Sequence, residues 1–394
     1  MAHLDAFATD DKRALAQLTT DFTQAEIWPH LSEWEQQGRL PRDLHRKAAE
    51  IGLLGVGIDE ELGGSGGDYT DVVVMTEAMI EAGASGGVIA ALFTHGIALP
   101  HVIDEYQRRC EAGDVSGADY LLDAVIKPVL SGSMVLALGV TEPDGGSDVA
   151  NLQTRASRTE AGWQVSGAKT YITSGVRADL VVAAVRTGET GDGAAGLTLM
   201  LLDPTSDGYA PPRELAKMGW WCSDTAELAF DGVSVPERDV LGLGRGFESL
   251  ARHFVAERLS LAVTAYATAQ RCLTLTETWT TQRETFGRAL STRQVVRHTL
   301  VEMYRHIDVA RVYTRTMAVR HVNGEHLVVE AAIAKQTAVA AAEFVANQAV
   351  QLHGGMGFMR ESEVERHYRD VRVLGIGGGA TQVMTDLVAR LRGY

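Results

Sequence analysis

One acidic side chain stands where the sequence pattern calls for an apolar one. Four apolar residues recur at steps of three, four and seven, which places them in one stripe along a helix: Phe247, Leu250, Phe254 and Leu261. Glu257 occupies the stripe position between the last two. A carboxylate on a buried helix face is costly unless it is paired or functional, because burial disfavours its charged form. The spacing allows two interpretations: a structural ion pair with Arg258, about 100° round the helix, or a general base in an apolar pocket.

Two polar turns that contain glycine each follow a predicted strand. The first, LGVTEPDGGSD at 138–148, follows an apolar strand at 134–140. The second, KTYITSG at 169–175, follows a strand at 162–167. Glycine lets the backbone approach a ligand closely, and such turns present N–H groups and small hydroxyls to a flat or anionic molecule. The two turns therefore predict a ligand site on a β domain.

Together these turns resemble the flavin-binding segments of the acyl-CoA dehydrogenases, TEPxAGSD and KxWITNG, in the family's order and spacing. Matches extend from about residue 40 to residue 390. The resemblance implies FAD as the cofactor and the α,β-desaturation of an acyl-CoA thioester to the trans-2-enoyl-CoA, with hydride passing from Cβ to flavin N5. It also implies an α+β fold with an N-terminal helical domain, a middle antiparallel β domain and a C-terminal four-helix bundle.

The resemblance favours the second interpretation of Glu257. The segment ERLSLA that begins at Glu257 is similar to ERLxLA of the isovaleryl- and long-chain acyl-CoA dehydrogenases, in which this glutamate is the catalytic base. The medium- and short-chain branch carries its base in IYEGTxQI near the C-terminus. The matching stretch here, LGIGGGATQV at 374–383, has Gly378 at the glutamate position. We therefore predict Glu257 as the base, with the main-chain N–H of Gly378 and a flavin ribityl hydroxyl polarising the thioester oxygen.

Other positions match the family's sites individually. Those implied around the isoalloxazine ring are Leu138, Val140, Thr141, Ser147, Tyr171 and Thr173. Arg283 matches the RxTFG arginine, which reaches the FAD pyrophosphate of a neighbouring subunit. Further implied cofactor contacts are Phe286, Gln294, Gln351, Gly355 and Gln382. The substrate contacts implied are Ser147, Arg258, Gly378 and Gly379. The chain departs from the family at Tyr171 (often Trp), Trp221 (usually Arg) and Ala380 (commonly Thr).

Three units are needed to position these residues. Residues 1–136 read as helical, with a helix from Pro41 to the stop at Gly52, others at 71–84 and 85–99, and a surface loop at 108–121. Residues 137–240 contain short β-branched or alternating runs between Gly, Asp and Pro turns, which predict a small antiparallel sheet. Residues 241–394 return to helical periodicity, with breaks at Gly287, 323–324 and 353–357.

Composition narrows the class of partner. The chain has 36 basic and 51 acidic residues, a net charge of −15, which argues against nucleic acid or an anionic membrane as the main partner. Three dispersed cysteines and an N-terminus without signal-peptide or transit-peptide features predict a cytoplasmic protein without membrane insertion. The resemblance implies an acyl-CoA substrate, electron-transfer flavoprotein as the acceptor, and a homotetramer built as a dimer of dimers.

Several alternatives stay open at this point. An oxidase or monooxygenase on the same scaffold would differ only in reoxidation by O₂, and a flavin-free subunit would lack turns that this chain has. Gly63 to Gly67 formally fits the GxSxG elbow, so a hydrolase using Ser65 is a remote alternative. The histidines show no metal-ligand spacing, and we predict no metal. The acyl group also stays open, although Gly378 vacates volume that would suit a branched chain.

Overall fold

The computed structural model describes residues 6–394, in which the first unit is helical. Its elements are α2 (Asp10–Phe22), η1 (Thr23–Ile27), α3 (Leu31–Gln37), α4 (Arg42–Glu50), η2 (Leu53–Gly55), η3 (Glu60–Leu62), α5 (Tyr69–Glu81), α6 (Gly86–Leu92), α7 (His95–Glu111), α8 (Val115–Leu121), η4 (Leu122–Ile126) and α9 (Lys127–Leu130). The loop predicted at 108–121 is wrong, because α7 continues to Glu111 and α8 follows at once. Asp114 caps α8 by accepting from the N–H of Gly117, a local signal inside the polar run. The helix predicted at 85–99 is divided between α6 and α7.

The middle unit is one twisted sheet. Its strands are β1 (Leu136–Gly139), β2 (Arg155–Thr159), β3 (Gly162–Thr173), β4 (Leu180–Arg186), β5 (Leu197–Leu202), β6 (Arg213–Glu214), β7 (Thr225–Val235) and β8 (Val240–Leu241). The order is β6-β7-β3-β2-β4-β5-β8, with β1 beside β4. Most pairs are antiparallel as predicted, but β1 and β2 each pair with β4 in parallel. The long return between β1 and β4, through the first polar turn and the β2–β3 hairpin, makes that direction possible.

The C-terminal unit is a helical bundle built on three long helices. Its elements are α10 (Gly246–Gln282), β9 (Glu284–Thr285), β10 (Arg288–Ala289), η8 (Leu290–Thr292), α11 (Gln294–Val322), α12 (Val328–His353), η9 (Gly354–Phe358), α13 (Glu363–Val371), η10 (Arg372–Gly375) and α14 (Thr381–Arg392). Buried alanines along α12, such as Ala334, Ala338 and Ala342, let α10 and α11 pack closely against it. The predicted order of helical, β and helical units is confirmed.

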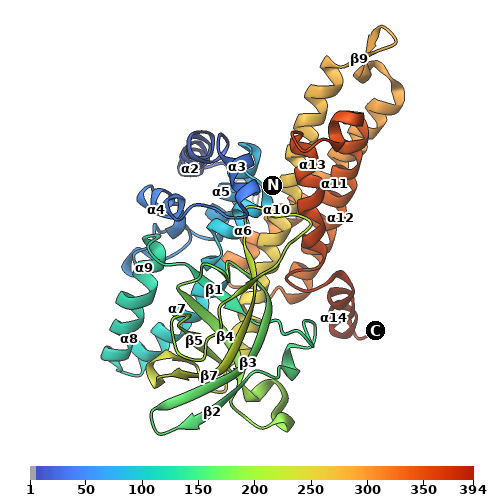
Figure 1. Cartoon of the computed structure of the whole chain (residues 1–394). Coiled ribbons are helices and arrows are strands. Elements are labelled where there is room, and N and C mark those ends of the chain that lie inside the picture. Colours follow the sequence, from blue (N-terminus) through green and yellow to red (C-terminus); the bar gives the residue numbers. More distant parts are fainter. Residues whose placement is uncertain (1–5) are drawn as a thin grey trace.

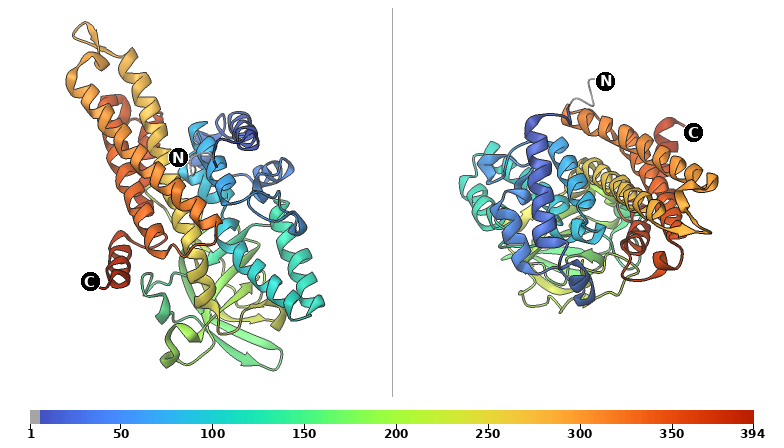
Figure 2. Two further views of the ribbon diagram at one scale, coloured as in Figure 1. Left: turned by 180° about the vertical axis from the view of Figure 1, so that it is seen from behind. Right: turned by 90° about the horizontal axis from the view of Figure 1, so that it is seen from above.

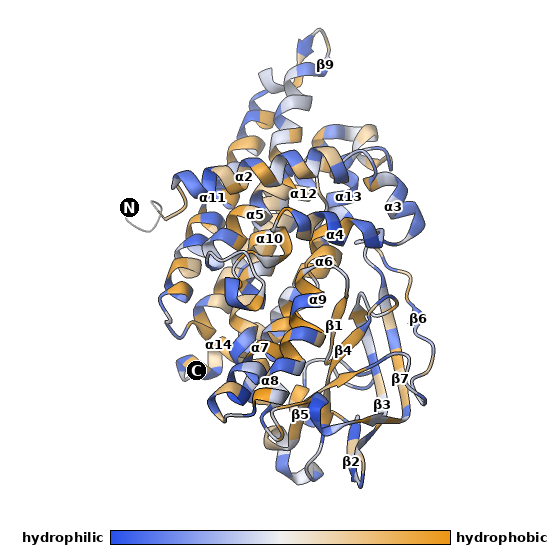
Figure 3. Cartoon of the chain, turned by 90° about the vertical axis from the view of Figure 1, so that its left-hand side faces the viewer, coloured by the Kyte–Doolittle hydropathy of each residue, from blue (hydrophilic) through white to orange (hydrophobic). Residues whose placement is uncertain are grey.

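The arrangement of these units gives the folded molecule two distant ends. Figure 1 shows the sheet at one end and the β9–β10 hairpin at the far tip of α10 and α11. From behind, the same helices extend well beyond the N-terminal unit (Figure 2). Between the ends, α10 joins the core, since Leu250 and Phe254 belong to the apolar cluster that includes β1, β4 and α7. Figure 3 shows β1 and β4 as predominantly hydrophobic strands in this region.

One helical stretch is long and apolar enough to span a membrane by length and composition alone. It covers Gly86–Glu111, and 61% of its most apolar window is buried inside the protein. The structure divides the stretch into α6 and α7. Core helices of soluble proteins commonly pass the same test, so this feature is weak support for a membrane span.

Candidate functional site

The structure places Glu257 and Gly378 side by side. Glu257 lies midway along α10, and Gly378 lies in the turn between η10 and α14. The Glu257 Oε1 atom is 3.3 Å from the point that a Cβ on Gly378 would occupy. Gly378 has φ +61°, a left-handed conformation that favours glycine. The two positions at which the family's branches carry a carboxylate therefore face one space, approached from two different elements.

That space is narrower than the sequence suggested. A Cβ on Gly378 would come within 2.3 Å of Leu261 Cδ1, so the leucine fills the volume that the missing side chain leaves. The expectation of room for a branched acyl chain beside Gly378 is therefore not supported. The acyl group must therefore be selected by residues other than Gly378.

The electrostatic surroundings of Glu257 suit a base. Burial raises the pKa of its carboxyl, and the charges of Arg258 and Lys335 oppose that rise only in part. Within residues 6–394 its carboxylate accepts no hydrogen bond and forms no ion pair within 4.0 Å. The structural ion pair with Arg258 is thus absent. The Arg258 guanidinium instead lies over the Phe254 ring, 5.3 Å from its centroid, and its Nε atom has no hydrogen-bond partner among residues 6–394.

The two predicted flavin turns are held together by buried polar contacts. The N–H of Thr170 donates to the carbonyl of Thr141 at 2.9 Å. Lys169 Nζ donates to the carbonyl of Val140 at 3.1 Å and to Glu142 Oε1 at 2.8 Å. Both charged side chains are buried, and burial lowers the pKa of Lys169 to about 8 although Glu142 opposes the change. Sequence reasoning quoted both residues inside the motifs but missed their role as the link between them.

The first predicted flavin turn packs in an apolar cluster that includes α10. Leu138 and Val140 pack in the same apolar cluster as Phe254, one turn of helix before Glu257. Tyr171 is 70% exposed and has φ +60°, a strained conformation for a residue with a side chain. The remaining predicted ring contacts, Thr141, Ser147 and Thr173, lie on the same turns, and Ser147 is exposed. The first turn thus shares an apolar cluster with α10, and the second turn carries an exposed aromatic side chain on a strained backbone.

A second group of predicted cofactor residues lies at the other end of the folded molecule, near the β9–β10 hairpin. Arg283 ends α10, and its guanidinium lies 5.9 Å from the Trp279 ring centroid. Trp279 stacks on His353 at 5.1 Å and 17°, which ties this end of α10 to the segment carrying Gln351 and Gly355. Gln294 is the first residue of α11, and Phe286 at the hairpin tip is 97% exposed with φ +51°. Figure 1 shows this tip far from the sheet, so one chain does not unite the two groups.

The remaining predicted contacts lie around Gly378. Gly379 has φ +96° and packs against Met384, and its carbonyl accepts from Lys335. Gln382 is exposed on the first turn of α14. The donor set as a whole fits FAD, because exposed aromatic rings suit a flavin and an adenine, and Arg283 suits a pyrophosphate. Apart from their chain neighbours, no atom of residues 6–394 would lie within 4 Å of a Cβ on Gly354 or Gly355, so that backbone is open to a ligand.

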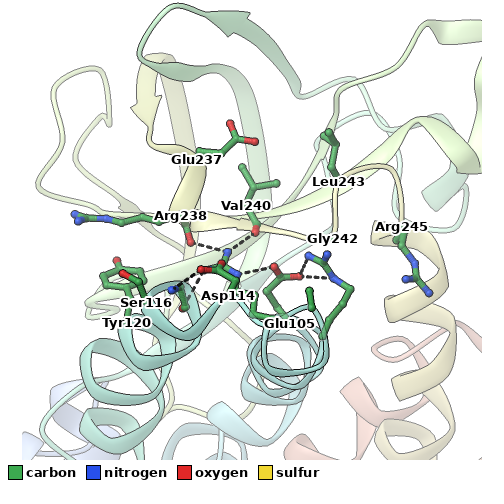
Figure 4. A pocket seen from close by; sticks show the side chains of 14 residues that line it. Glu105, Asp114, Ser116, Tyr120, Glu237, Arg238, Val240, Gly242, Leu243 and Arg245 are labelled. Carbon is green, nitrogen blue, oxygen red and sulfur yellow. Dashed lines mark hydrogen bonds and ion pairs between the residues drawn. The ribbon is translucent and has the colours of Figure 1, made fainter.

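A cavity of about 770 Å³ lies between α7, α8 and β8, away from all of these residues (Figure 4). At its base Arg109 donates to Glu105 and to the carbonyls of Arg238 and Val240. None of the predicted site residues lines it. The buried charges of Arg109 and Glu105 pair with each other, so we interpret the cavity as part of the contact between the first helical unit and the sheet.

The remote hydrolase alternative finds no support at Ser65. The Ser65 hydroxyl donates to the carbonyl of Gly52 at 2.7 Å, and the residue follows the one-turn helix η3 instead of a strand. A nucleophile elbow requires a strand-to-helix turn with a histidine in reach. In the described part of the chain, no group of three or more His, Cys, Asp and Glu side chains is arranged to hold a metal ion.

Comparisons with known proteins match three successive parts of the chain to the same family. Residues 9–107, 137–233 and 244–391 match the models of the N-terminal, middle and C-terminal domains of acyl-CoA dehydrogenase. The long-chain specific acyl-CoA dehydrogenase, mitochondrial, of Mus musculus is 33% identical over 371 residues, which cover 94% of this chain and 83% of that protein. Isovaleryl-CoA dehydrogenase, mitochondrial, of Solanum tuberosum is 29% identical over 384 residues, covering 97% and 90%. The crystal structure of a probable acyl-CoA dehydrogenase from Mycobacterium abscessus is 52% identical with a TM-score of 0.94, covering 98% and 100% of the two chains.

Proposed function

The chain belongs to the acyl-CoA dehydrogenase family, and on that premise we propose that Glu257 removes the α-proton of its acyl-CoA substrate. The reaction of the family is the α,β-desaturation of an acyl-CoA thioester, which needs a base at Cα and a hydride acceptor at Cβ. FAD, when bound, supplies the hydride acceptor. The protein must therefore supply the base, the donors that polarise the thioester, and a site that excludes water.

The observation that carries the proposal is the unpartnered carboxylate of Glu257 beside Gly378. A carboxylate whose ionised form is disfavoured by apolar surroundings is a stronger base than one in water. Gly378 brings no carboxylate of its own, and in residues 6–394 its N–H donates to no protein acceptor. This donor is free to polarise a thioester oxygen placed over Glu257. Leu138 and Val140 would wall the same space from the sheet.

We further propose that FAD binds between protomers of a homotetramer assembled as a dimer of dimers. The two groups of cofactor residues lie at opposite ends of the folded molecule, so a second chain would supply the missing half of each site. Apolar side chains along α11 are exposed and would serve as an interface: Val295, Val301, Tyr304, Val309 and Val312. Electron-transfer flavoprotein is the acceptor that the family resemblance favours, and turnover with a dye acceptor against O₂ would distinguish a dehydrogenase from an oxidase.

The decisive experiment replaces Glu257 by glutamine. Glu257→Gln should keep FAD and acyl-CoA binding near wild type, yet slow anaerobic flavin reduction by roughly 10²–10⁴-fold, because proton abstraction is lost while binding stays. Glu277→Gln, an exposed change on the same helix, is the matched control and should reduce at the wild-type rate. Reduction of the Glu257→Gln flavin within tenfold of wild type would exclude Glu257 as the base.

A further inference from the structure

Lys335 is a buried ammonium beside the proposed reaction centre. It lies on α12 in a run of buried alanines, and 2% of its side chain is exposed. Its Nζ atom donates to the carbonyl of Gly379 at 2.6 Å and also to the carbonyl of Gly377. Among residues 6–394 no carboxylate lies within 4.0 Å of it. A buried lysine whose partners in the described part of the chain are two backbone carbonyls is costly, so the site must gain something from it.

The ammonium and the Glu257 carboxylate flank Gly378. Lys335 Nζ is 3.7 Å and Glu257 Oε1 is 3.3 Å from the same point, the Cβ position of Gly378, so the two charges are within about 7 Å of each other. Burial lowers the pKa of Lys335 to about 8, and Glu257 opposes that change while Arg258 adds to it. The charged groups that act on Glu257 are Arg258 on its own helix and Lys335 on the facing helix. Lys335 therefore favours the ionised form of Glu257.

The two carbonyl contacts also fix the direction of a donor. In a trans peptide the C=O and N–H bonds point in opposite directions, and the described chain contains no cis peptide bond. The carbonyl of Gly377 points at Lys335, so the N–H of Gly378 in the same peptide points away from it. The hydrogen bond from Lys335 to the carbonyl of Gly379 fixes the peptide between Gly379 and Ala380 in the same way. Three consecutive glycines would otherwise leave this turn free to rotate.

We propose that Lys335 is a positioning residue for the desaturation: it clamps the carbonyls of Gly377 and Gly379, so that the N–H of Gly378 faces the thioester oxygen, and its charge favours the ionised form of Glu257. The inference rests on the proposed roles of Glu257 and Gly378. Lys335 touches neither substrate nor flavin in this scheme, because it acts through the glycine turn on one side and through its charge on the other.

Three variants of the holoenzyme separate these two effects. Lys335→Met removes the clamp and the charge, Lys335→Gln keeps a neutral donor, and Lys335→Arg keeps the charge. Polarisation is read from the ultraviolet band of a bound arylacryloyl-CoA, a conjugated thioester whose absorption moves to longer wavelength when donors polarise its carbonyl. The apparent pKa of the base is obtained from the lower limb of the pH profile of anaerobic flavin reduction. FAD content and assembled mass are measured for each variant.

Lys335→Met should reduce flavin roughly 10²–10³-fold more slowly with a smaller wavelength shift, because a donor of the oxyanion is no longer directed. Its acyl-CoA affinity should stay within a few-fold. The lower limb of the pH profile should move up by about one unit in the Met and Gln variants and stay in place with Arg. Gln336→Leu is the matched control, since Gln336 is the next residue of α12 and binds Thr381 and Thr385 of α14 without a charge. It should leave the wavelength shift and the pH profile unchanged.

Each outcome decides one way. An unchanged wavelength shift, rate and pH profile in Lys335→Met with full FAD would overturn the proposal. If Lys335→Met does not assemble, the Gln variant carries the test, and an unmoved pH profile there would overturn the charge effect. Wild-type protein that desaturates no acyl-CoA would refute the proposed function instead, which keeps the two failures distinct.

Discussion

Moving the base from α10 to the glycine turn tests the geometry of the site most directly. The perturbation is Glu257→Gly combined with Gly378→Glu, which removes one carboxylate and places another on the element that carries it in the family's other branch. Because both positions border one space, with 3.3 Å between Glu257 Oε1 and the Cβ point of Gly378, the new carboxylate should reach the same α-carbon.

The structure also predicts how large the obstacle is. A side chain at 378 must adopt φ near +61°, which costs roughly 1–2 kcal/mol for a residue other than glycine. Its Cβ meets Leu261 Cδ1 at 2.3 Å, an overpacking that typically costs about 1–3 kcal/mol. Adding Leu261→Ala removes the second cost and leaves the first. If the strained conformer must be reached before proton abstraction, that relief should accelerate flavin reduction by about 5- to 150-fold.

The assay is anaerobic stopped-flow reduction of the bound flavin by straight and branched acyl-CoAs. Glu257→Gly with Leu261→Ala, which has room but no base, is the control for the triple variant. We expect the triple variant to exceed both this control and the double variant without Leu261→Ala. If the triple variant is no faster than its baseless control on any substrate, position 378 does not face the α-carbon and the proposed geometry is wrong.

Three further predictions concern the cofactor, the pH dependence and the link between the turns. Arg283→Ala and, less severely, Arg283→Lys should lower both FAD occupancy and assembled mass, because ligand and interface are linked; a wild-type monomer with full FAD, by light scattering and absorbance, would contradict the shared site. Burial raises the pKa of Asp370 to about 6, so the native state binds this proton more tightly than the unfolded state and stability falls as pH rises from about 4 through 6. Asp370→Asn should therefore gain up to about 3 kcal/mol over wild type at pH 7.5 but not at pH 4, measured by denaturant unfolding, provided that the contact with the N–H of Trp220 persists. Lys169→Met should destabilise by roughly 3–5 kcal/mol and release FAD, since it leaves Glu142 buried and unpaired, and Glu142→Gln in the same chain should recover part of the loss.

Local patterns were sufficient to predict much of this molecule. The stripe that exposes Glu257 as an exception needs only helical periodicity, and the turns at 138–148 and 169–175 carry their own glycine and strand signals. Gly378 could be aligned with a missing carboxylate through the resemblance of its contiguous segment to the family's IYEGTxQI motif. Each of these features depends on residues within a few positions along the chain.

Features created by distant contacts could not be predicted in this way. Lys335 carries no signal of its own in the sequence, because its partners, the carbonyls of Gly377 and Gly379, lie about 40 residues later in the chain. Leu261 fills the space beside Gly378 from another element. The parallel pairing of β1 with β4 depends on how some 40 intervening residues return to the sheet.

The proposed sharing of FAD between protomers has a genetic consequence, because Arg283 stands at the base of the projecting β9–β10 hairpin. If each protomer lends its Arg283 to a neighbour while using its own Glu257, a chain defective at one position can rescue a chain defective at the other. In a mixed dimer of Arg283→Ala and Glu257→Gln chains, one site receives both lesions and the other receives none. Random pairing of the two chains would leave about a quarter of the sites intact, although either chain expressed alone has no fully intact site. Two alleles that are each harmful alone would thus complement each other in one cell.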